Sequence, residues 1–283
     1  DKHTLSEICY TLQQRNLFEH RLSIFAKDKN DIIQALQDFI DSKQNPNLFT
    51  SKNIDNNGQI VFQFTGQGSQ YFGMCRNYYK SFEYFKNTID FCDEELKQYL
   101  GESIKNVMWK HEDKHLIHQT KYTQPAIFIV EYALAQLLMK YGIQPTMLVG
   151  HSIGELVALT ISGVLEIKDA LKIVSMRGNL MQNIPDNNGG MAAVFANAQT
   201  IVDLNNDNIV EIAGYNTTNN TTITGDKEQI AIFIERLKEQ NIRAVPLQVS
   251  HAFHSKDMES IFVDFQNICN EINFSFAQIP LAS

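Results

Sequence analysis

The sequence predicts an α/β fold in which a region built on a parallel sheet is interrupted by a smaller α+β insert. Three observations lead to this prediction. The apolar run Thr146–Val149 leads directly into Gly150-His151-Ser152-Ile153-Gly154, and a helical apolar pattern follows. Another apolar run, Ile60–Phe64, ends in a turn with two glycines. Between residues 189 and 250 the pattern becomes strand, helix, strand, strand, helix, strand, which is the ferredoxin-like arrangement.

Residues 1–58 are predicted to form a small unit of their own. A helical apolar stripe begins at Leu5, Arg21–Ala26 has the composition of a strand, and Asp31–Ile40 repeats the helical period. The run from Ser42 to Gly58 is rich in Asn, Asp, Lys and Ser. We interpret this run as a linker to the next region, because such clusters are typical of loops.

The strand Ile60–Phe64 is followed by Thr65-Gly66-Gln67-Gly68-Ser69-Gln70. Glycines on both sides of Gln67 allow backbone amides to approach a ligand closely. An ordinary strand-to-helix turn has the same composition, so spacing alone leaves both interpretations open. The segment lacks the third glycine of a dinucleotide-binding fingerprint, and it is not a phosphate-binding loop.

Helices and polar connections are predicted for residues 75–122. A strong apolar stripe predicts a helix over Gln124–Tyr141, with Pro125 in its first turn. A further helix over Ile167–Met181 carries Arg177. After the insert, a last helix is predicted over Met258–Ile272.

The segment His111-Glu112-Asp113-Lys114-His115 matches the zinc-protease pattern H-E-x-x-H. That chemistry needs a long helix with apolar flanks and a third ligand within reach. Here the middle of the motif is entirely charged, and the preceding segment is short and loop-like. We therefore interpret these histidines, together with His118, as a solvated surface and predict no metal site.

Gly150–Gly154 lies between a strand and a helix, the context that a nucleophile elbow requires. Such a sharp turn forces Ser152 into a strained backbone conformation and leaves no room for side chains at Gly150 and Gly154. The serine hydroxyl then projects at a helix N-terminus, where amides and the helix dipole favour a developing negative charge. Ser152 is therefore predicted to be a nucleophile.

The composition excludes several classes of partner. The 283 residues contain 24 Lys and Arg against 32 Asp and Glu, a net charge of -8, which disfavours nucleic acid and anionic membranes. No apolar run is long enough to span a membrane. The four cysteines lack metal-binding or disulfide-framework spacing, so we expect reduced, mostly buried thiols and a cytoplasmic location. The start at Asp1 suggests a piece of a longer polypeptide.

Four ordered motifs together resemble the malonyl-type acyltransferase domains of fatty acid and polyketide synthases, a family related to malonyl-CoA:acyl carrier protein transacylase. They are Phe64–Gln70, Gly150–Glu155, Met176-Arg177-Gly178 and His251–Ser255. The resemblance implies an α/β-hydrolase-like large subdomain over 59–188 and 251–283, and a ferredoxin-like small subdomain over 189–250. Residues 1–58 are similar to the linker subdomain between ketosynthase and acyltransferase in modular polyketide synthases.

The resemblance also implies roles for individual residues. Ser152 is the nucleophile and His254 the general base, while the backbone amides of Gln67 and Ile153 form the oxyanion hole. Arg177 binds the free carboxylate of a malonyl group. The expected pocket residues are Gln124, His151, Phe253, His251 and Asn216.

The implied reaction is ping-pong transfer from a CoA or carrier-protein thioester to the phosphopantetheine of an acyl carrier protein. No metal and no bound cofactor are implied, and a ketosynthase is the expected neighbour in the same polypeptide. In this family His-Ala-Phe-His accompanies malonyl, so Phe253 predicts malonyl over methylmalonyl. A malonyl group with a small hydroxyl or amino substituent at C2 stays open as an alternative.

Two other functions remain compatible with the sequence. A serine hydrolase of the α/β type needs an acid between serine and histidine, and several aspartates, from Asp169 to Asp226, lie in that interval. A non-catalytic scaffold segment of a synthase is the second alternative, although Ser152, His254 and Arg177 are all intact.

The resemblance finally implies a longer chain. In the family, a continuation beyond the strand that Ile279–Ser283 enters supplies a backbone carbonyl that orients the histidine, and a glutamine near the site. We therefore expect residues 1–283 to be an incomplete acyltransferase, less stable and less active than an extended chain.

Overall fold

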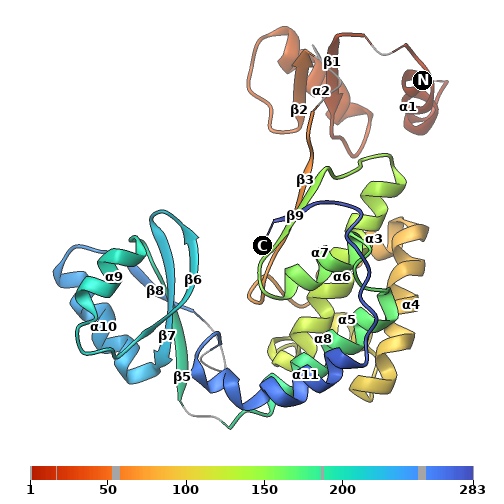
Figure 1. Ribbon diagram of the computed structural model, residues 1–283. Coiled ribbons are helices and arrows are strands. Elements are labelled where there is room, and N and C mark those ends of the chain that lie inside the picture. The colour runs from red at the N-terminus through yellow and green to blue at the C-terminus, as the bar shows by residue number, and fades with distance from the viewer. Residues whose placement is uncertain (1, 17, 53–57, 186–187, 248–252, 283) are drawn as a thin grey trace. The chain divides into compact units, whose positions relative to one another are not determined.

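The computed structural model describes residues 2–16, 18–52, 58–185, 188–247 and 253–282. The chain divides into two compact units, Asp1–Gly58 and Gln59–Ser283 (Figure 1).

The first unit contains two helices and a two-stranded antiparallel sheet. Its elements are α1 (Leu5–Gln13), β1 (His20–Ile24), α2 (Lys29–Ile40) and β2 (Leu48–Lys52). Thr4 and Glu7 form a capping box at the start of α1, and the Asp28 carboxylate accepts backbone N–H bonds at the start of α2. Among its described residues, Ala35 is the one buried hydrophobic side chain.

The prediction of a linker over Ser42–Gly58 was wrong in its middle. Leu48–Lys52 is a strand that pairs antiparallel with β1, with Leu48 opposite Ile24. Leu48, Phe49 and the β-branched Thr50 favour extended backbone, and pairing with β1 satisfies polar backbone groups that a lone strand would leave open. Tertiary pairing thus outweighs the polar composition of the segment.

The second unit is organised around a three-stranded parallel sheet. Its strands are β3 (Val61–Phe64), β4 (Met147–Gly150) and β9 (Leu281–Ala282), in the order β3-β4-β9. Phe64 pairs with Gly150, so β3 and β4 end side by side. The turn that contains Gln67 and the turn that contains Ser152 therefore leave the sheet at the same edge, where open α/β sheets bind their ligands.

Helices lie beside this sheet (Figure 1). They are α3 (Arg76–Ser81), α4 (Glu83–Leu100), α5 (Ile104–Trp109), the 3₁₀ turn η1 (Leu116–His118), α6 (Thr120–Lys140), α7 (Ile153–Ile161) and α8 (Ile167–Gln182). The central helix α6 packs against α4, α7 and α8, and α7 packs against β3 and β4. Fully buried Phe85, Phe128 and Leu148 belong to the shared core.

Helix α6 begins at Thr120, one turn earlier than predicted, so Pro125 lies in its second turn. A proline there cannot donate to the carbonyl four residues earlier. Gln124, Pro125 and Ala126 are all buried. Packing of this segment therefore stabilises a helix that local preference would start later.

The four-stranded region confirms the predicted ferredoxin-like arrangement. Its elements are β5 (Gly189–Val194), α9 (Ala198–Leu204), β6 (Glu211–Thr217), β7 (Asn220–Asp226), α10 (Lys227–Glu239) and β8 (Ala244–Pro246). The strand order is β6-β7-β5-β8, and all neighbours are antiparallel. Ala192, Ile223 and Phe233 are among the side chains of a separate core between the sheet and its helices. Residues 248–250, the end of the predicted ferredoxin-like segment, lie outside the described residues.

After this region the chain returns to the parallel sheet through η2 (Lys256–Ile261) and α11 (Phe262–Asn270). We call residues 253–270 the return segment. The single helix predicted over Met258–Ile272 is thus divided into a 3₁₀ segment and a shorter α-helix. A third, small apolar cluster joins the return segment to α8 and β5, through Met181, Ile184, Met191, Phe253 and Met258.

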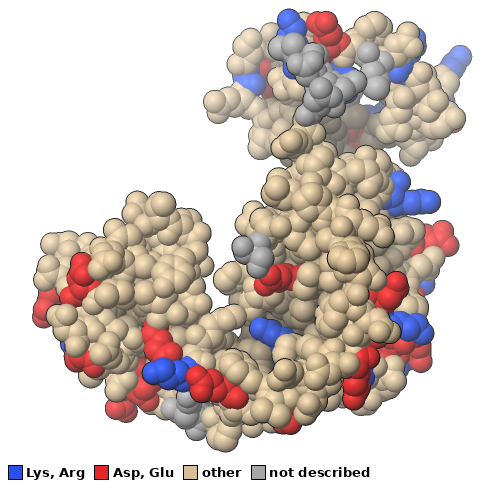
Figure 2. Space-filling model, in the orientation of Figure 1, with Lys and Arg blue, Asp and Glu red and all other residues tan. Residues whose placement is uncertain are grey.

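All four cysteines are free thiols, but only Cys92 is fully buried, which corrects the expectation of mostly buried cysteines. Burial raises the pKa of Cys92 to about 12. None of the described helices combines the length and apolarity needed to cross a membrane. On the face shown in Figure 2, Lys and Arg side chains are interspersed with Asp and Glu.

Candidate active site

Ser152 has the backbone strain that the elbow prediction requires. Its φ of 54° and ψ of -111° place it at the N-cap of α7, in a conformation that non-glycine residues rarely adopt. A Cβ on Gly150 would lie 2.3 Å from the Glu155 nitrogen, and one on Gly154 would lie 2.6 Å from the Phe64 oxygen. Both glycines are therefore required by close backbone contacts, as predicted.

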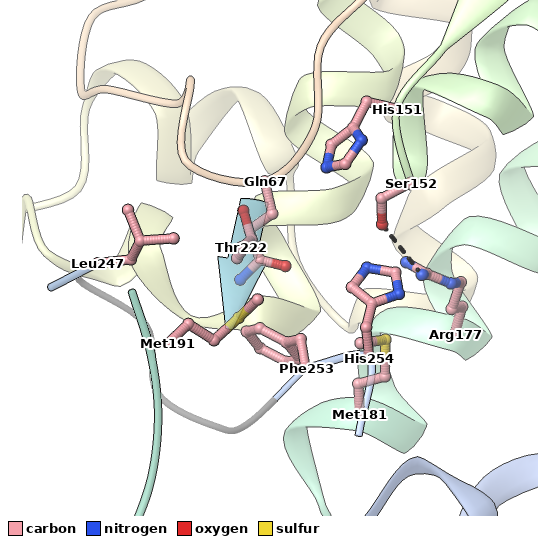
Figure 3. A pocket seen from close by; sticks show the side chains of 10 residues that line it. All are labelled: Gln67, His151, Ser152, Arg177, Met181, Met191, Thr222, Leu247, Phe253 and His254. Atoms are coloured by element: carbon pink, nitrogen blue, oxygen red, sulfur yellow. Dashed lines mark hydrogen bonds between the residues drawn. The ribbon is translucent and has the colours of Figure 1, made fainter. Parts of the chain in front are cut away.

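A cavity lies at the edge of the parallel sheet, next to this serine. It lies where the turns after β3 and β4 approach α8, the four-stranded sheet and the return segment. Figure 3 shows Ser152, Arg177 and His254 at one end and Met191 and Leu247 at the other. The lining residues are Gln67, His151, Ser152, Arg177, Met181, Met191, Thr222, Leu247, Phe253 and His254.

Arg177 is held beside the serine by a buried amide. Its Nη1 donates to Oε1 of Gln124 at 2.7 Å, and its Nη2 donates to Oγ of Ser152 at 3.3 Å. No carboxylate among the described residues forms a salt bridge with it. Burial lowers the pKa of Arg177, which reflects the cost of keeping its charge out of water. A buried guanidinium without an acidic partner favours an anionic ligand at this position.

His254 enters the cavity from the return segment, with a positive φ of 58°. The surrounding protein lowers the pKa of His254, mainly by desolvation and further through the charges of Arg177 and His151. The neutral imidazole, the form that can accept a proton, is therefore favoured. A group that orients the ring is not found among the described residues, so the predicted backbone carbonyl stays a prediction.

The oxyanion hole predicted from the backbone amides of Gln67 and Ile153 stays a prediction, and the positions of the two residues are compatible with it. Ile153 is the first residue of α7, where amides have no partner within the helix. Gln67 lines the cavity and lies between Gly66 and Gly68. A Cβ on Gly66 would lie 2.6 Å from Cδ2 of His151. A side chain at Gly66 would therefore separate the Gln67 turn from the elbow.

The remaining predicted pocket residues have different positions. Phe253 lines the cavity and is 5% exposed, and His151 lines it as well. Gln124 contacts Arg177 from behind and also donates to the sulfur of Met181. Asn216 is exposed and does not line the cavity. Its side-chain amide donates to Oγ1 of Thr222, and Thr222 does line the cavity. His251 lies outside the described residues.

Four lining residues were not predicted: Met181, Met191, Thr222 and Leu247. Met181 follows Arg177 by four residues on α8 and so lies on the same helix face. This spacing was a usable signal. Met191, Thr222 and Leu247 come from the four-stranded region, and only the tertiary arrangement brings them to the serine.

Neither alternative site geometry is present among the described residues. His111 and His115 lie in loop and turn rather than on a helix, and no group of three or more potential ligands is placed to hold a metal ion. None of the described aspartates between Ser152 and His254 lines the cavity. Asp207 instead pairs with Arg236, and Asp226 caps α10.

Comparisons with known proteins give a consistent result. The family model described as acyl transferase domain matches residues 61–282, and the model described as RhiE-like, KS-MAT linker domain matches residues 1–43. The phenolphthiocerol synthesis polyketide synthase type I Pks15/1 of Mycobacterium marinum is 34% identical over 277 residues, which are 98% of this chain and 13% of that protein. The chain thus spans only a small part of this relative.

Solved structures share the fold. The acyltransferase domain from the second module of the salinomycin polyketide synthase superposes with a TM-score of 0.84 at 30% identity, covering 99% of this chain and 66% of that one. A type II polyketide synthase acyl-carrier protein in complex with its malonyl-transacylase gives 0.70 at 26% identity, covering 79% of this chain and 74% of that one. Because the family model covers most of the chain, which also presents the strained serine of a nucleophile elbow, the protein belongs to the acyl transferase domain family.

Proposed function

We propose that the protein transfers a malonyl-type acyl group from a thioester to the phosphopantetheine thiol of an acyl carrier protein, through an acyl-serine intermediate. One observation carries this proposal. Arg177, a largely desolvated cation that pairs with no carboxylate of the described residues, donates to the hydroxyl of the strained Ser152. A simple esterase has no use for this cation, whereas an acyl group with a free carboxylate needs it.

The first half-reaction forms the acyl-serine. His254 takes the proton from Oγ of Ser152 as that oxygen attacks the thioester carbonyl carbon. The carbonyl oxygen gains negative charge and is stabilised by the amides of Gln67 and Ile153. The carbon–sulfur bond then breaks, and His254 returns the proton to the departing thiolate. The substrate carboxylate binds Arg177, which fixes the carbonyl carbon beside the serine.

The second half-reaction repeats these steps with a new thiol. The phosphopantetheine thiol of the carrier gives its proton to His254 and attacks the acyl carbon. The bond between that carbon and Oγ of Ser152 then breaks, and His254 returns the proton to Oγ. The related malonyl-transacylase solved in complex with an acyl-carrier protein supports this partner. Carriers are commonly acidic, and the face in Figure 2 offers them interspersed charges rather than a broad basic area. We therefore expect weak, transient docking.

The polyketide synthase relative and the linker match support a ketosynthase neighbour in a longer polypeptide. Phe253 and Met191 support malonyl as the preferred group, because both are bulky side chains that line the cavity and leave less room for a C2 methyl. Thr222, whose hydroxyl oxygen accepts from Asn216, keeps a small polar C2 substituent as the second candidate.

Intact-mass measurement with malonyl-CoA tests the proposal. The protein should gain one malonyl group, and Ser152→Ala should gain none. Ser175→Ala is the matched control, because its buried hydroxyl bonds only the Leu171 carbonyl of its own helix, and it should label normally. Labelling of Ser152→Ala, or a wild-type protein that only hydrolyses the thioester, would contradict the assignment.

A further inference from the structure

Glu131 is a buried acid that the proposed mechanism does not use. It lies on α6, and its Oε1 accepts two bonds from Thr65, from the backbone N–H at 2.7 Å and from the hydroxyl at 2.6 Å. Its Oε2 is buried and has no partner among the described residues. A buried polar atom without a partner destabilises a fold, so its retention calls for an explanation.

The surroundings of this carboxyl are mainly apolar. They include Phe62, Phe64, Leu134 and Leu138. Desolvation raises the pKa of Glu131, while the bonds from Thr65 oppose that rise. In these surroundings an apolar side chain would avoid the cost of desolvating a carboxyl. The contact with Thr65 is the one interaction described here that an apolar side chain could not make.

Thr65 begins the turn that places Gln67 in the cavity. The hydroxyls of Thr65 and Ser69 lie 2.8 Å apart. Because the single proton of the Thr65 hydroxyl goes to Glu131, Ser69 is the donor of this bond, and the Gly66 carbonyl lies 3.2 Å from its Oγ. The chain Glu131–Thr65–Ser69 therefore connects a rigid helix to both ends of the Gly66–Gly68 turn. Glycines make this turn flexible, so an external contact is needed to fix its amides.

The same helix also holds the other side of the site. Gln124 bonds Arg177, and Glu131 follows Gln124 by seven residues, about two helical turns later on the same face. We propose that Glu131 is a positioning residue that fixes the Thr65–Gly68 turn, so that the Gln67 amide faces the acyl oxygen while Gln124 fixes Arg177. This inference rests on the proposed function, because the Gln67 amide matters only where an oxyanion forms.

Three variants test the proposal in single-turnover acylation by malonyl-CoA. Glu131→Leu removes the acceptor and should lower the saturating rate by about 10- to 100-fold, less than full loss of an oxyanion donor, with half-saturation little changed. Glu131→Gln keeps Oε1 and should stay within about threefold of wild type. Asp93→Leu is the matched control, because Asp93 is a buried carboxylate that likewise accepts a hydroxyl and a backbone amide, from Ser103 and Lys105. It should lose thermal stability but not rate.

A wild-type rate in Glu131→Leu, an equal loss in Glu131→Gln, or an equal loss in Asp93→Leu would overturn the proposal. If Glu131→Leu does not fold, Thr65→Val is used in its place and should lower the acylation rate about threefold to tenfold. An unchanged rate in Thr65→Val would also overturn the proposal. Amide hydrogen exchange of residues 64–70 distinguishes failure of the proposed acyl transfer from failure of the positioning role of Glu131. If wild type is never acylated, the proposed function fails, while faster exchange of this turn in Glu131→Leu still supports its positioning.

Discussion

The two ends of the cavity are built differently. At the elbow end, backbone strain fixes Ser152, and Arg177 is tied to a fully buried glutamine. At the opposite end, the four-stranded region supplies Met191 and Leu247, and Phe253 lies between the two ends (Figure 3). Polar groups in fixed geometry thus face adaptable apolar ones.

This difference separates two tasks. Chemistry at the acyl carbon needs donors and acceptors placed within a few tenths of an ångström, which rigid elements provide. Choice among acyl groups that differ by one methyl relies on side-chain bulk, and methionines adapt to the shape of a ligand. Changes at the elbow end should therefore cost orders of magnitude in rate, and changes at the apolar end should mainly alter selectivity.

The largest effect should come from His254. Its replacement by Ala should lower acylation by about 10²- to 10⁴-fold, the range for a lost general base. Because the folded pKa of His254 lies below its ordinary value of 6.5, the imidazole should remain neutral as the pH falls to 6.5. Wild-type acylation should then be flat near neutral pH and decline only below 6.5.

Stability should respond in the same direction. The unfolded chain binds this proton at higher pH than the folded one, so His254 destabilises the fold as pH falls through 6.5.

The charge of Arg177 is one cause of the lowered pKa of His254. In Arg177→Ala, the pH at which the acylation rate with acetyl-CoA falls to half should therefore be higher than in wild type. The exposed His115→Ala is the control and should leave rate and midpoint unchanged. An acid limb centred above 6.5 in wild type would contradict the assigned environment.

A smaller effect is expected at the apolar end. Phe253→Ala should reduce the preference for malonyl-CoA over methylmalonyl-CoA by about tenfold, since one methyl is worth about 1–3 kcal/mol in such a pocket. The malonyl rate itself should change little. Phe195→Ala, an exposed phenylalanine of the four-stranded region, is the control. A wild type that uses both donors equally would show that Phe253 does not select the acyl group.

The same contrast explains what the sequence could predict. The elbow is local, because strand, glycines and helix follow one another within a dozen residues, so Ser152 and its strain were predictable. The strand order of the ferredoxin-like region followed from its element order. The roles of Arg177 and His254 were predicted from the resemblance to acyltransferases. Both residues are distant from Ser152 in the sequence, and no spacing rule links them to it.

Other features needed the tertiary structure. β2 was missed because its polar residues are typical of loops, and only pairing with β1 makes Leu48–Lys52 a strand. The start of α6 was placed too late because Pro125 favours a first turn, while buried packing extends the helix to Thr120. Thr222 and Leu247 reach the cavity through sheet pairing, and Glu131 contacts Thr65 across 66 residues of sequence.

The central claim is that Arg177 recognises a carboxylate on the acyl group attached to Ser152. The most direct test compares acylation rates from malonyl-CoA and acetyl-CoA, by intact mass, in wild type and Arg177→Ala. Breaking a buried charge pair costs about 3–5 kcal/mol, so the malonyl rate should fall by about 10²- to 10⁴-fold while the acetyl rate is kept or improved. Equal losses with both donors would contradict the account and make Arg177 a structural residue of the cavity.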